Sequence, residues 1–235
     1  MDQSPANAVA RCEVHAGRIH HLRDAHLALL RDGELVGARQ YRLAADRDRT
    51  LLGAVLLRLA AARYLGGRPA DIAVDRRCDR CRAQHGRPQL PGSGLHASVS
   101  HSGDVVAVAL TAAGPVGVDI EVVRAIDVEA VADSVCRPAE RRRLATTAGF
   151  YSYWTRKEAV LKATGEGLSR PMTDLHVTPP DSAPVLLQFG SESRPACQLA
   201  DLPVGDGYRA CVAVLTAEPV AVATLDATEM LAASS

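Results

Sequence analysis

Apolar residues recur at helical spacing in several stretches of the chain. Between residues 46 and 65 they follow a 3.6-residue period, and a glycine pair ends the pattern, which predicts a long helix. Residues 149–164 form a second, aromatic-rich pattern of the same kind. A shorter helix is expected at residues 22–30, and a helical stretch at residues 127–145.

Short apolar runs bounded by turn residues predict strands. Two of them are joined by a turn at Ser102-Gly103, and a second turn rich in Ala, Gly and Pro precedes a third. The polar residues 75–94 read as a long loop. The strands are expected at residues 97–100, 105–110, 116–123 and 208–215.

This order of elements predicts an α+β chain in two halves. We expect the halves to be residues 1–114 and 115–235, since the similar apolar runs 105–110 and 211–215 each fall late in one half. A break near Gly114 would place residues 116–121 along a cleft between the halves, a common location for a ligand.

Composition narrows the class of protein. A hydrophobic content of 47% is ample for a core, and a formal net charge of +0 speaks against a general nucleic-acid binder. No apolar run approaches the length of a membrane span, and the first residues do not resemble a secretory signal. We therefore expect a cytoplasmic protein whose six cysteines are reduced.

Lysine is used only twice. The sequence counts 27 Lys plus Arg, and the lysines are Lys157 and Lys162, both in the aromatic-rich helix. A lysine ammonium is a compact charge suited to point contact with phosphate oxygens, whereas accident in an arginine-rich composition is the alternative.

Two carboxylates lie on one face of an apolar strand. Asp119 and Glu121 are two residues apart, and a strand repeats its faces every two residues. Burying both unpaired would be costly, and a bound Mg²⁺ would resolve their repulsion. An exposed strand with its polar face in water is the alternative.

Glu158 supplies a third candidate carboxylate. It lies between the two lysines, and on a helix it shares a stripe with Trp154 and Lys162. Carboxylates that bind a metal beside ammonium groups that bind phosphate suit a metal–phosphate complex. An ordinary surface Glu–Lys pair is the alternative.

These segments resemble the Sfp-type 4′-phosphopantetheinyl transferases. The family's signatures (V/I)-G-(V/I)-D-(I/V)-E and W-x-x-K-E-x-x-x-K are matched without departure by residues 116–121 and 154–162. Three further segments are similar: Ser98 to Gly103, His85-Gly-Arg87-Pro88 with Arg in place of the commoner Lys, and Arg49 to Gly53. The resemblance covers roughly residues 45–175.

The resemblance implies a pseudo-dimer of two similar α/β halves, with coenzyme A in the cleft between them. It also implies a holo-[acyl-carrier-protein] synthase type of reaction, in which the 4′-phosphopantetheine arm of coenzyme A moves to a serine of a carrier protein. Adenosine 3′,5′-bisphosphate is released, and Mg²⁺ or Mn²⁺ is required.

Site residues follow from the match. The first half is expected to hold the adenine and the 3′-phosphate, and the second half the metal and the catalytic residues. Glu158 or a metal-bound water would take the serine proton, and Lys162 would stabilise the leaving group. The expected metal ligands are Asp119, Glu121 and Glu158, and the expected coenzyme A contacts are Arg49, Arg87, Pro88, Ser100, His101, Lys157 and Lys162.

The basic run at residues 137–143 is a candidate surface for the carrier. Carriers of this kind are acidic and helical, so Arg137 and Arg141 could meet one, although a solvated helix face explains the run equally well. Acyl, peptidyl and aryl carriers of fatty acid, polyketide and nonribosomal peptide systems all stay open. We expect the chain to act as a monomer, without nucleic acid or membrane.

Cys78 and Cys81 form a C-x₂-C pair with His85 four positions further on. Structural zinc takes four ligands, and no second C-x₂-C pair completes the set, so zinc is not expected.

Two other functions compete with the transferase. A catalytically silent coenzyme A-binding scaffold of the same fold would be favoured by degraded metal ligands, but all three carboxylates are present. A metal-dependent nucleotide phosphohydrolase would use the same carboxylates but gives no reason for the other segments.

Overall fold

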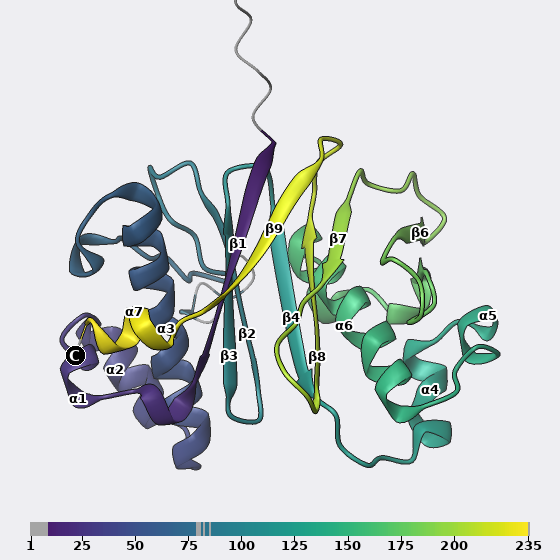
Figure 1. The fold of residues 1–235 in the computed structure, drawn as a ribbon, viewed down its shortest axis with the longest axis horizontal. Helices are drawn as coiled ribbons and strands as arrows, with labels where there is room; N and C mark the ends of the chain where they lie inside the picture. Colours follow the sequence, from purple (N-terminus) through teal and green to yellow (C-terminus); the bar gives the residue numbers. More distant parts are fainter. Residues whose placement is uncertain (1–8, 79–80, 82, 85, 235) are drawn as a thin grey trace, which may run out of the picture.

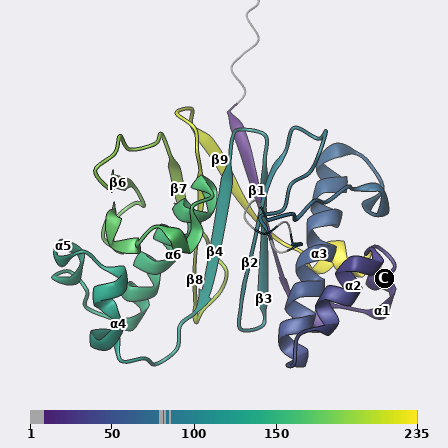
Figure 2. The same ribbon diagram turned by 180° about the vertical axis from the view of Figure 1, so that it is seen from behind.

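The computed structural model describes residues 9–78, 81, 83–84 and 86–234. Two β-sheets lie next to each other in the middle of the molecule, and helices cover their outer sides (Figure 1; Figure 2 shows the reverse view). The α+β class expected from the sequence is confirmed. No helix in the described part of the chain is long and apolar enough to cross a membrane.

The first sheet has four strands in the order β2-β3-β1-β9. Strand β3 pairs antiparallel with both β2 and β1, whereas β9 pairs parallel to β1. The strands are β2 (His96–Ser102), β3 (Val105–Thr111), β1 (Ala10–Arg18) and β9 (Val220–Asp226).

The second sheet has three antiparallel strands in the order β4-β8-β7. A separate two-stranded ribbon, β5 paired with β6, lies on the far side of this half (Figure 1). The strands are β4 (Val116–Val122), β8 (Tyr208–Val214), β7 (Gln198–Asp201), β5 (Leu175–Val177) and β6 (Leu186–Phe189).

Each sheet is covered by one long helix. The first, α3 (Ala44–Leu65), ends at Gly66, whose left-handed φ of 72° lets the chain turn away. The second, α6 (Thr147–Thr164), is capped by the Thr146 hydroxyl, which accepts a hydrogen bond from the Gly149 amide. The shorter helices are α1 (Asp24–Leu27), α2 (Asp32–Arg39), α4 (Val128–Val135), α5 (Pro138–Arg141) and α7 (Thr228–Ala232).

Three hydrophobic cores follow these layers. One packs α3 against the first sheet and another packs α6 against the second sheet. The third joins the two sheets, and includes Val14 and Ala107 from the first and Val118 and Ile120 from the second. The two sheets therefore share a dry interface, and polar groups on strands β2 and β4 have to be satisfied along its border.

The end of the chain returns to the first half. Strand β9 pairs with β1, and Leu231 of α7 packs in the α3 core. Residues 220–232 therefore lie with the first half, although the sequence-based division assigned residues 115–235 to the second. The expected helical stretch 127–145 is divided into α4 and α5, because Pro138 disfavours helical geometry at Arg137, whose ψ is 159°.

Candidate active site at the junction of the two sheets

Strand β4 carries Gly117, Asp119 and Glu121 on its face toward α6. Its other face, with Val118 and Ile120, is buried in the core between the sheets. A Cβ atom at Gly117 would lie 2.0 Å from the carbonyl oxygen of Ala159, so only glycine lets α6 lie directly on the strand. This close approach brings the second half of α6 beside the two carboxylates.

Lys162 reaches from α6 to the carboxylate of Asp119. Its Nζ lies 2.6 Å from Asp119 Oδ1, 2.9 Å from Ser100 Oγ and 3.1 Å from the carbonyl oxygen of Val118. The Lys162 side chain is 29% exposed, whereas that of Asp119 is 5% exposed. Protein therefore encloses the Asp119 carboxylate, whereas the Lys162 side chain is partly accessible to solvent.

Ser98, Ser100 and Ser102 form a row along one face of β2, which we call the serine row. Their hydroxyl oxygens accept hydrogen bonds from three alternate backbone amides of β4, at 3.0, 3.4 and 3.1 Å. The donors are the amides of Val118, Ile120 and Val122, in that order. The serine row thus joins the edge strands of the two sheets without direct backbone pairing.

Two members of the serine row also donate to the carboxylates. Ser100 Oγ donates to Asp119 Oδ1 at 3.0 Å, and Ser102 Oγ donates to Glu121 Oε2 at 2.7 Å. Ser98 lies opposite Gly117, which has no side chain. Residues from both halves therefore meet at this site.

The three carboxylates disfavour one another's charge. Burial raises the pKa of Glu158, and the negative charge of Asp119 raises it further. Burial likewise raises the pKa of Glu121, although the Ser102 hydrogen bond opposes the shift. Asp119 Oδ2 is buried and has no hydrogen-bond partner among the residues that the structure describes. Such an oxygen, in a group of mutually repelling carboxylates, fits a divalent cation.

The carboxylates nevertheless do not stand at the spacing of a finished metal site. Within the described residues, no three His, Cys, Asp or Glu side chains are grouped closely enough to hold a metal ion. Asp119 and Glu121 are instead turned toward Lys162 and Ser102. The chemistry of this donor set suits Mg²⁺ or Mn²⁺, and Asp119, Glu121 and Glu158 are the residues that could hold it.

Lys157 does not belong to this site, which corrects the expectation that it contacts phosphate. Its side chain is fully buried on another side of α6, where Nζ lies 2.5 Å from Glu140 Oε2 and 2.7 Å from the carbonyl oxygen of Val135. Burial lowers the pKa of Lys157, and Glu140 opposes the shift. Five residues of helix separate the two lysines by about 140° around the axis, so they cannot share a face.

Arg49 reaches the turn after β2 and lies near His101, which is close to the end of that strand. Arg49 donates to the carbonyl oxygen of Gly103 and pairs with Asp46. Burial lowers the pKa of His101, and the positive charges of Arg49 and Lys162 lower it further. An anionic group near this turn would meet three basic side chains from two halves of the molecule.

Arg87 joins the loop of the first half to the end of α6. Its Nη1 donates to the carbonyl oxygens of Lys162 and Ala163 at 3.3 and 3.0 Å, where a helix leaves such groups unpaired. Its Nε is buried and finds no hydrogen-bond partner in the described part of the chain, and Pro88 beside it is buried. Arg87 therefore contacts the backbone of Lys162 itself, about one helical turn beyond Glu158 on the C-terminal side.

The basic run is less available than its sequence suggests. Arg141 pairs with Asp133 and Glu129, and Arg137 donates to the side-chain oxygen of Gln188 at 2.7 Å. Arg142 and Arg143 are exposed. For the C-x₂-C pair, Cys78 is half-buried and Cys81 is exposed, whereas His85 lies outside the described residues.

Sequence reasoning missed three participants. Ser102 contacts Glu121, Tyr208 contacts the turn that follows Ser102, and Glu140 holds Lys157. The alternation Ser98-x-Ser100-x-Ser102 could have been matched with Gly117-x-Asp119-x-Glu121, because both repeat every two residues. Tyr208 and Glu140 carry no local signal, since each acts on a segment far away in the chain.

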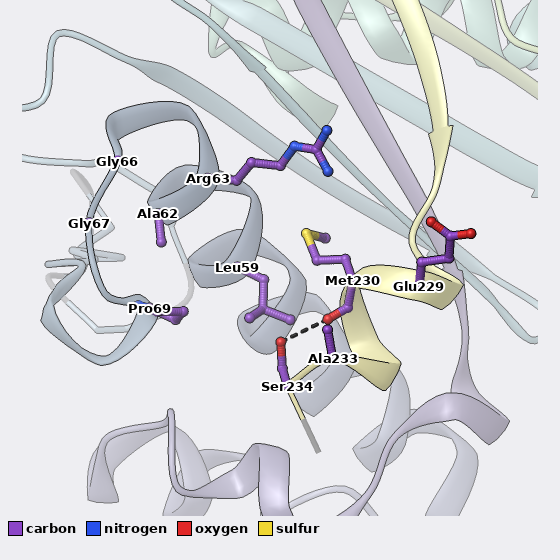
Figure 3. A pocket seen from close by; sticks show the side chains of 10 residues that line it. All are labelled: Leu59, Ala62, Arg63, Gly66, Gly67, Pro69, Glu229, Met230, Ala233 and Ser234. Atoms are coloured by element: carbon purple, nitrogen blue, oxygen red, sulfur yellow. Dashed lines mark hydrogen bonds between the residues drawn. The ribbon is translucent and has the colours of Figure 1, made fainter.

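A shallow hollow of about 600 Å³ lies elsewhere, between the end of α3 and α7. Figure 3 shows Arg63, Met230 and Glu229 around it, with Gly66 and Gly67 at its rim. None of the site residues named above lines it, so the carboxylate site is a separate feature.

Comparison with known proteins bears on this geometry. A family model described as the 4′-phosphopantetheinyl transferase superfamily matches residues 115–213, which contain β4 and α6. The chain is 31% identical over 162 residues to 4′-phosphopantetheinyl transferase HetI of Nostoc sp. (strain PCC 7120 / SAG 25.82 / UTEX 2576), covering 64% of each chain. It is 31% identical over 149 residues to 4′-phosphopantetheinyl transferase psf-1 of Bacillus pumilus, covering 58% of this chain and 60% of that one.

A 4′-phosphopantetheinyl transferase of Bacillus subtilis is 29% identical over 166 residues, covering 68% of this chain and 69% of its own length. The match spans less than two thirds of the HetI and psf-1 chains. The matched family segment includes Asp119, Glu121, Glu158 and Lys162, which the fold brings together. Over this segment, the chain is similar to the 4′-phosphopantetheinyl transferase superfamily.

Proposed function

We propose that the chain transfers the 4′-phosphopantetheine arm of coenzyme A to a serine of a carrier protein, releasing adenosine 3′,5′-bisphosphate. The observation that carries the proposal is that three carboxylates lie near Lys162, and that one buried oxygen of Asp119 has no partner among the described residues. A divalent cation would supply positive charge to these carboxylates, and the diphosphate bound to it would supply negative charge to Lys162.

In this proposal Asp119, Glu121 and Glu158 hold Mg²⁺ or Mn²⁺. The cation would neutralise charge on the diphosphate during transfer. Lys162 would donate to a phosphate oxygen, which its partial exposure permits, and so stabilise the leaving group.

Glu158 is the proposed base for the carrier serine. A base works best when its pKa approaches the working pH, and burial raises the pKa of Glu158 from its ordinary value. Its carboxylate would accept the hydroxyl proton as the serine oxygen bonds to the β-phosphorus and the bond to the leaving phosphate breaks.

Arg49 and His101 would hold the 3′-phosphate, with Ser100 toward the diphosphate. Support comes from their position at one turn, where Arg49 contributes to lowering the pKa of His101. Arg87 and Pro88 would flank the adenine, because their loop adjoins the end of α6.

The carrier would dock beside α5 through the basic residues 137–143. Arg141 is already paired with Asp133 and Glu129, so the exposed Arg142 and Arg143 are the freer cations toward an acidic partner. The monomeric state and the cytoplasmic location stay predictions.

The decisive experiment incubates the protein with an apo carrier protein, coenzyme A and Mg²⁺, and measures the mass of the carrier. We expect a gain of one phosphopantetheine arm, and no gain for a carrier whose acceptor serine is replaced by alanine. Tight coenzyme A binding without any gain across acyl, peptidyl and aryl carriers would favour the silent scaffold instead.

A further inference from the structure

The serine row meets β4 in a regular register. Each serine of β2 faces a β4 amide exactly twenty positions later, so Ser98 pairs with Val118 and Ser102 with Val122. Each hydroxyl has one proton to donate, and in Ser102 that proton points to Glu121 Oε2. Ser102 Oγ thus connects the two sheets by accepting from the Val122 amide, and it contacts the Glu121 carboxylate by donating its proton.

We infer that Ser102, from the first half, is a positioning residue for the Glu121 carboxylate and thereby for cation binding in the second half. The inference rests on the metal site of the proposed function and adds a residue to it. Hydrogen-bond partners of ligating carboxylates orient those ligands and change metal affinity.

The backbone of Ser102 is itself fixed from both halves. The next residue, Gly103, has a φ of 58°, and a Cβ there would lie 2.5 Å from the hydroxyl oxygen of Tyr208. The Tyr208 hydroxyl donates to the Asp104 carboxylate and accepts from the Asp104 amide. Arg49 holds the carbonyl oxygen of Gly103 from α3. A turn fixed in this way holds the Ser102 hydroxyl at one place.

Ser102 differs from Ser100 in what it contacts. Ser100 Oγ already receives Lys162 and donates to Asp119, so removing it would disturb the ion pair as well. Ser102 contacts one carboxylate and one amide, of Glu121 and Val122. Its replacement therefore removes the contact with Glu121 together with one contact between the sheets, and leaves the Lys162–Asp119 pair in place.

Ser98 provides a matched control. Its hydroxyl accepts from the Val118 amide at 3.0 Å, as that of Ser102 accepts from Val122 at 3.1 Å. It faces Gly117, so it has no carboxylate to orient. Ser98→Ala and Ser102→Ala remove equivalent contacts between the sheets, and only the second removes a contact with a proposed metal ligand.

The experiment measures the dissociation constant of Mn²⁺ by electron paramagnetic resonance, with coenzyme A present, for the intact chain and both variants. We expect Ser102→Ala to raise that constant roughly tenfold and Ser98→Ala to leave it nearly unchanged. Amide hydrogen exchange provides a second readout, in which Val122 should lose protection in Ser102→Ala and Val118 in Ser98→Ala. If Ser102→Ala does not fold, Ser102→Cys, which keeps a weak donor of similar shape, takes its place with the same expected direction.

Equal Mn²⁺ affinity in the two variants would overturn the inference, even if both are destabilised. Absence of Mn²⁺ binding by the unaltered protein would overturn it as well. If the unaltered protein transfers the arm while Ser102→Ala binds Mn²⁺ normally, the positioning role fails and the proposed function stands. If Ser102→Ala weakens Mn²⁺ binding but no carrier is modified, the positioning role stands and the proposed reaction fails.

Discussion

The two lysines of α6 each meet a carboxylate, and the two pairs are built differently. Glu140 is satisfied on both oxygens, because Oε1 accepts from the Val177 amide and Oε2 accepts from Lys157 and the Arg137 amide. Asp119 receives Lys162 on Oδ1, but its Oδ2 is buried and has no partner within residues 9–78, 81, 83–84 and 86–234. The first pair is complete, whereas the second has capacity for one more positive group.

This difference separates a pair that is complete by itself from a pair that could accept a further ligand. A buried pair whose hydrogen bonds are all made fixes the segments that carry it, here α4, α5 and α6. A buried oxygen left without a partner costs free energy and persists where a ligand supplies the missing interaction. Residue type alone would have assigned both lysines to the same task.

The largest expected effect is on the Lys157–Glu140 pair. Lys157→Met leaves the Glu140 charge buried without its counter-ion, so we expect a loss of about 3–5 kcal/mol in the free energy of unfolding, measured in urea. The matched variant Lys162→Met should cost far less stability, since its side chain is partly exposed. Similar losses for both variants would contradict the distinction.

The next largest effect is expected on the Asp119–Lys162 pair. Asp119→Asn keeps the shape of the side chain but removes its charge, and we expect transfer to a carrier to fall about 100- to 1000-fold. The free energy of unfolding should change little in comparison with Lys157→Met. Near-normal turnover would rule out a role for Asp119 in holding a cation.

Lys162→Arg addresses whether the ammonium itself matters. The planar guanidinium cannot occupy the same point between Asp119 Oδ1 and Ser100 Oγ, so we expect roughly a tenfold loss of turnover. Steady-state rates with carrier and coenzyme A measure this. An unchanged rate would show that any cation serves at position 162.

The smallest expected effect concerns His101, which lies near Arg49 and Lys162. Its pKa lies below the ordinary value in the folded protein, so the folded state binds fewer protons than the unfolded state as the pH falls below about 6.5. Protonation of His101 therefore lowers the free energy of unfolding as the pH falls from about 6.5 toward the folded-state pKa, and has no such effect above that range. Because His101 is only partly desolvated and water screens the charges around it, we expect the loss to stay below about 1 kcal/mol.

The matched variant for this test is His101→Gln. Unfolding in urea at several pH values between neutral and mildly acidic should give a flatter profile for the variant than for the unaltered chain. Other histidines contribute to both profiles equally, so the difference isolates His101. Superimposable profiles would mean that Arg49 and Lys162 do not act on this ring.

Much of the fold could be predicted from local patterns. The expected helix 46–65 corresponds to α3 (Ala44–Leu65), and the expected strand 208–215 corresponds to β8 (Tyr208–Val214). Strand β1 (Ala10–Arg18) was missed, because Glu13 and His15 interrupt its apolar pattern. Its partners lie about 90 and 210 residues further along the chain, as the pairs Ala16–Ala107 and Ala10–Val220 show, and no local window contains them.

The candidate site divides in the same way. Asp119, Glu121, Glu158 and Lys162 could be identified because strand and helix periodicity put each pair on one face. The burial of Lys157 away from this site could not be predicted, because it depends on Glu140 and Val135, which α5 and α4 bring to the far side of α6. Periodicity says which residues share a face, but not what that face will meet.

By itself, the sequence determined the α+β class, predicted which residues could bind a cation and a phosphate, and indicated a family resemblance. The tertiary structure alone decided which lysine is buried, which half receives β9, and that serines of one half orient carboxylates of the other. The physical reason is that local periodicity is set by backbone geometry, which neighbouring residues share. Burial and pairing of charge depend instead on segments that meet only when the two sheets pack together.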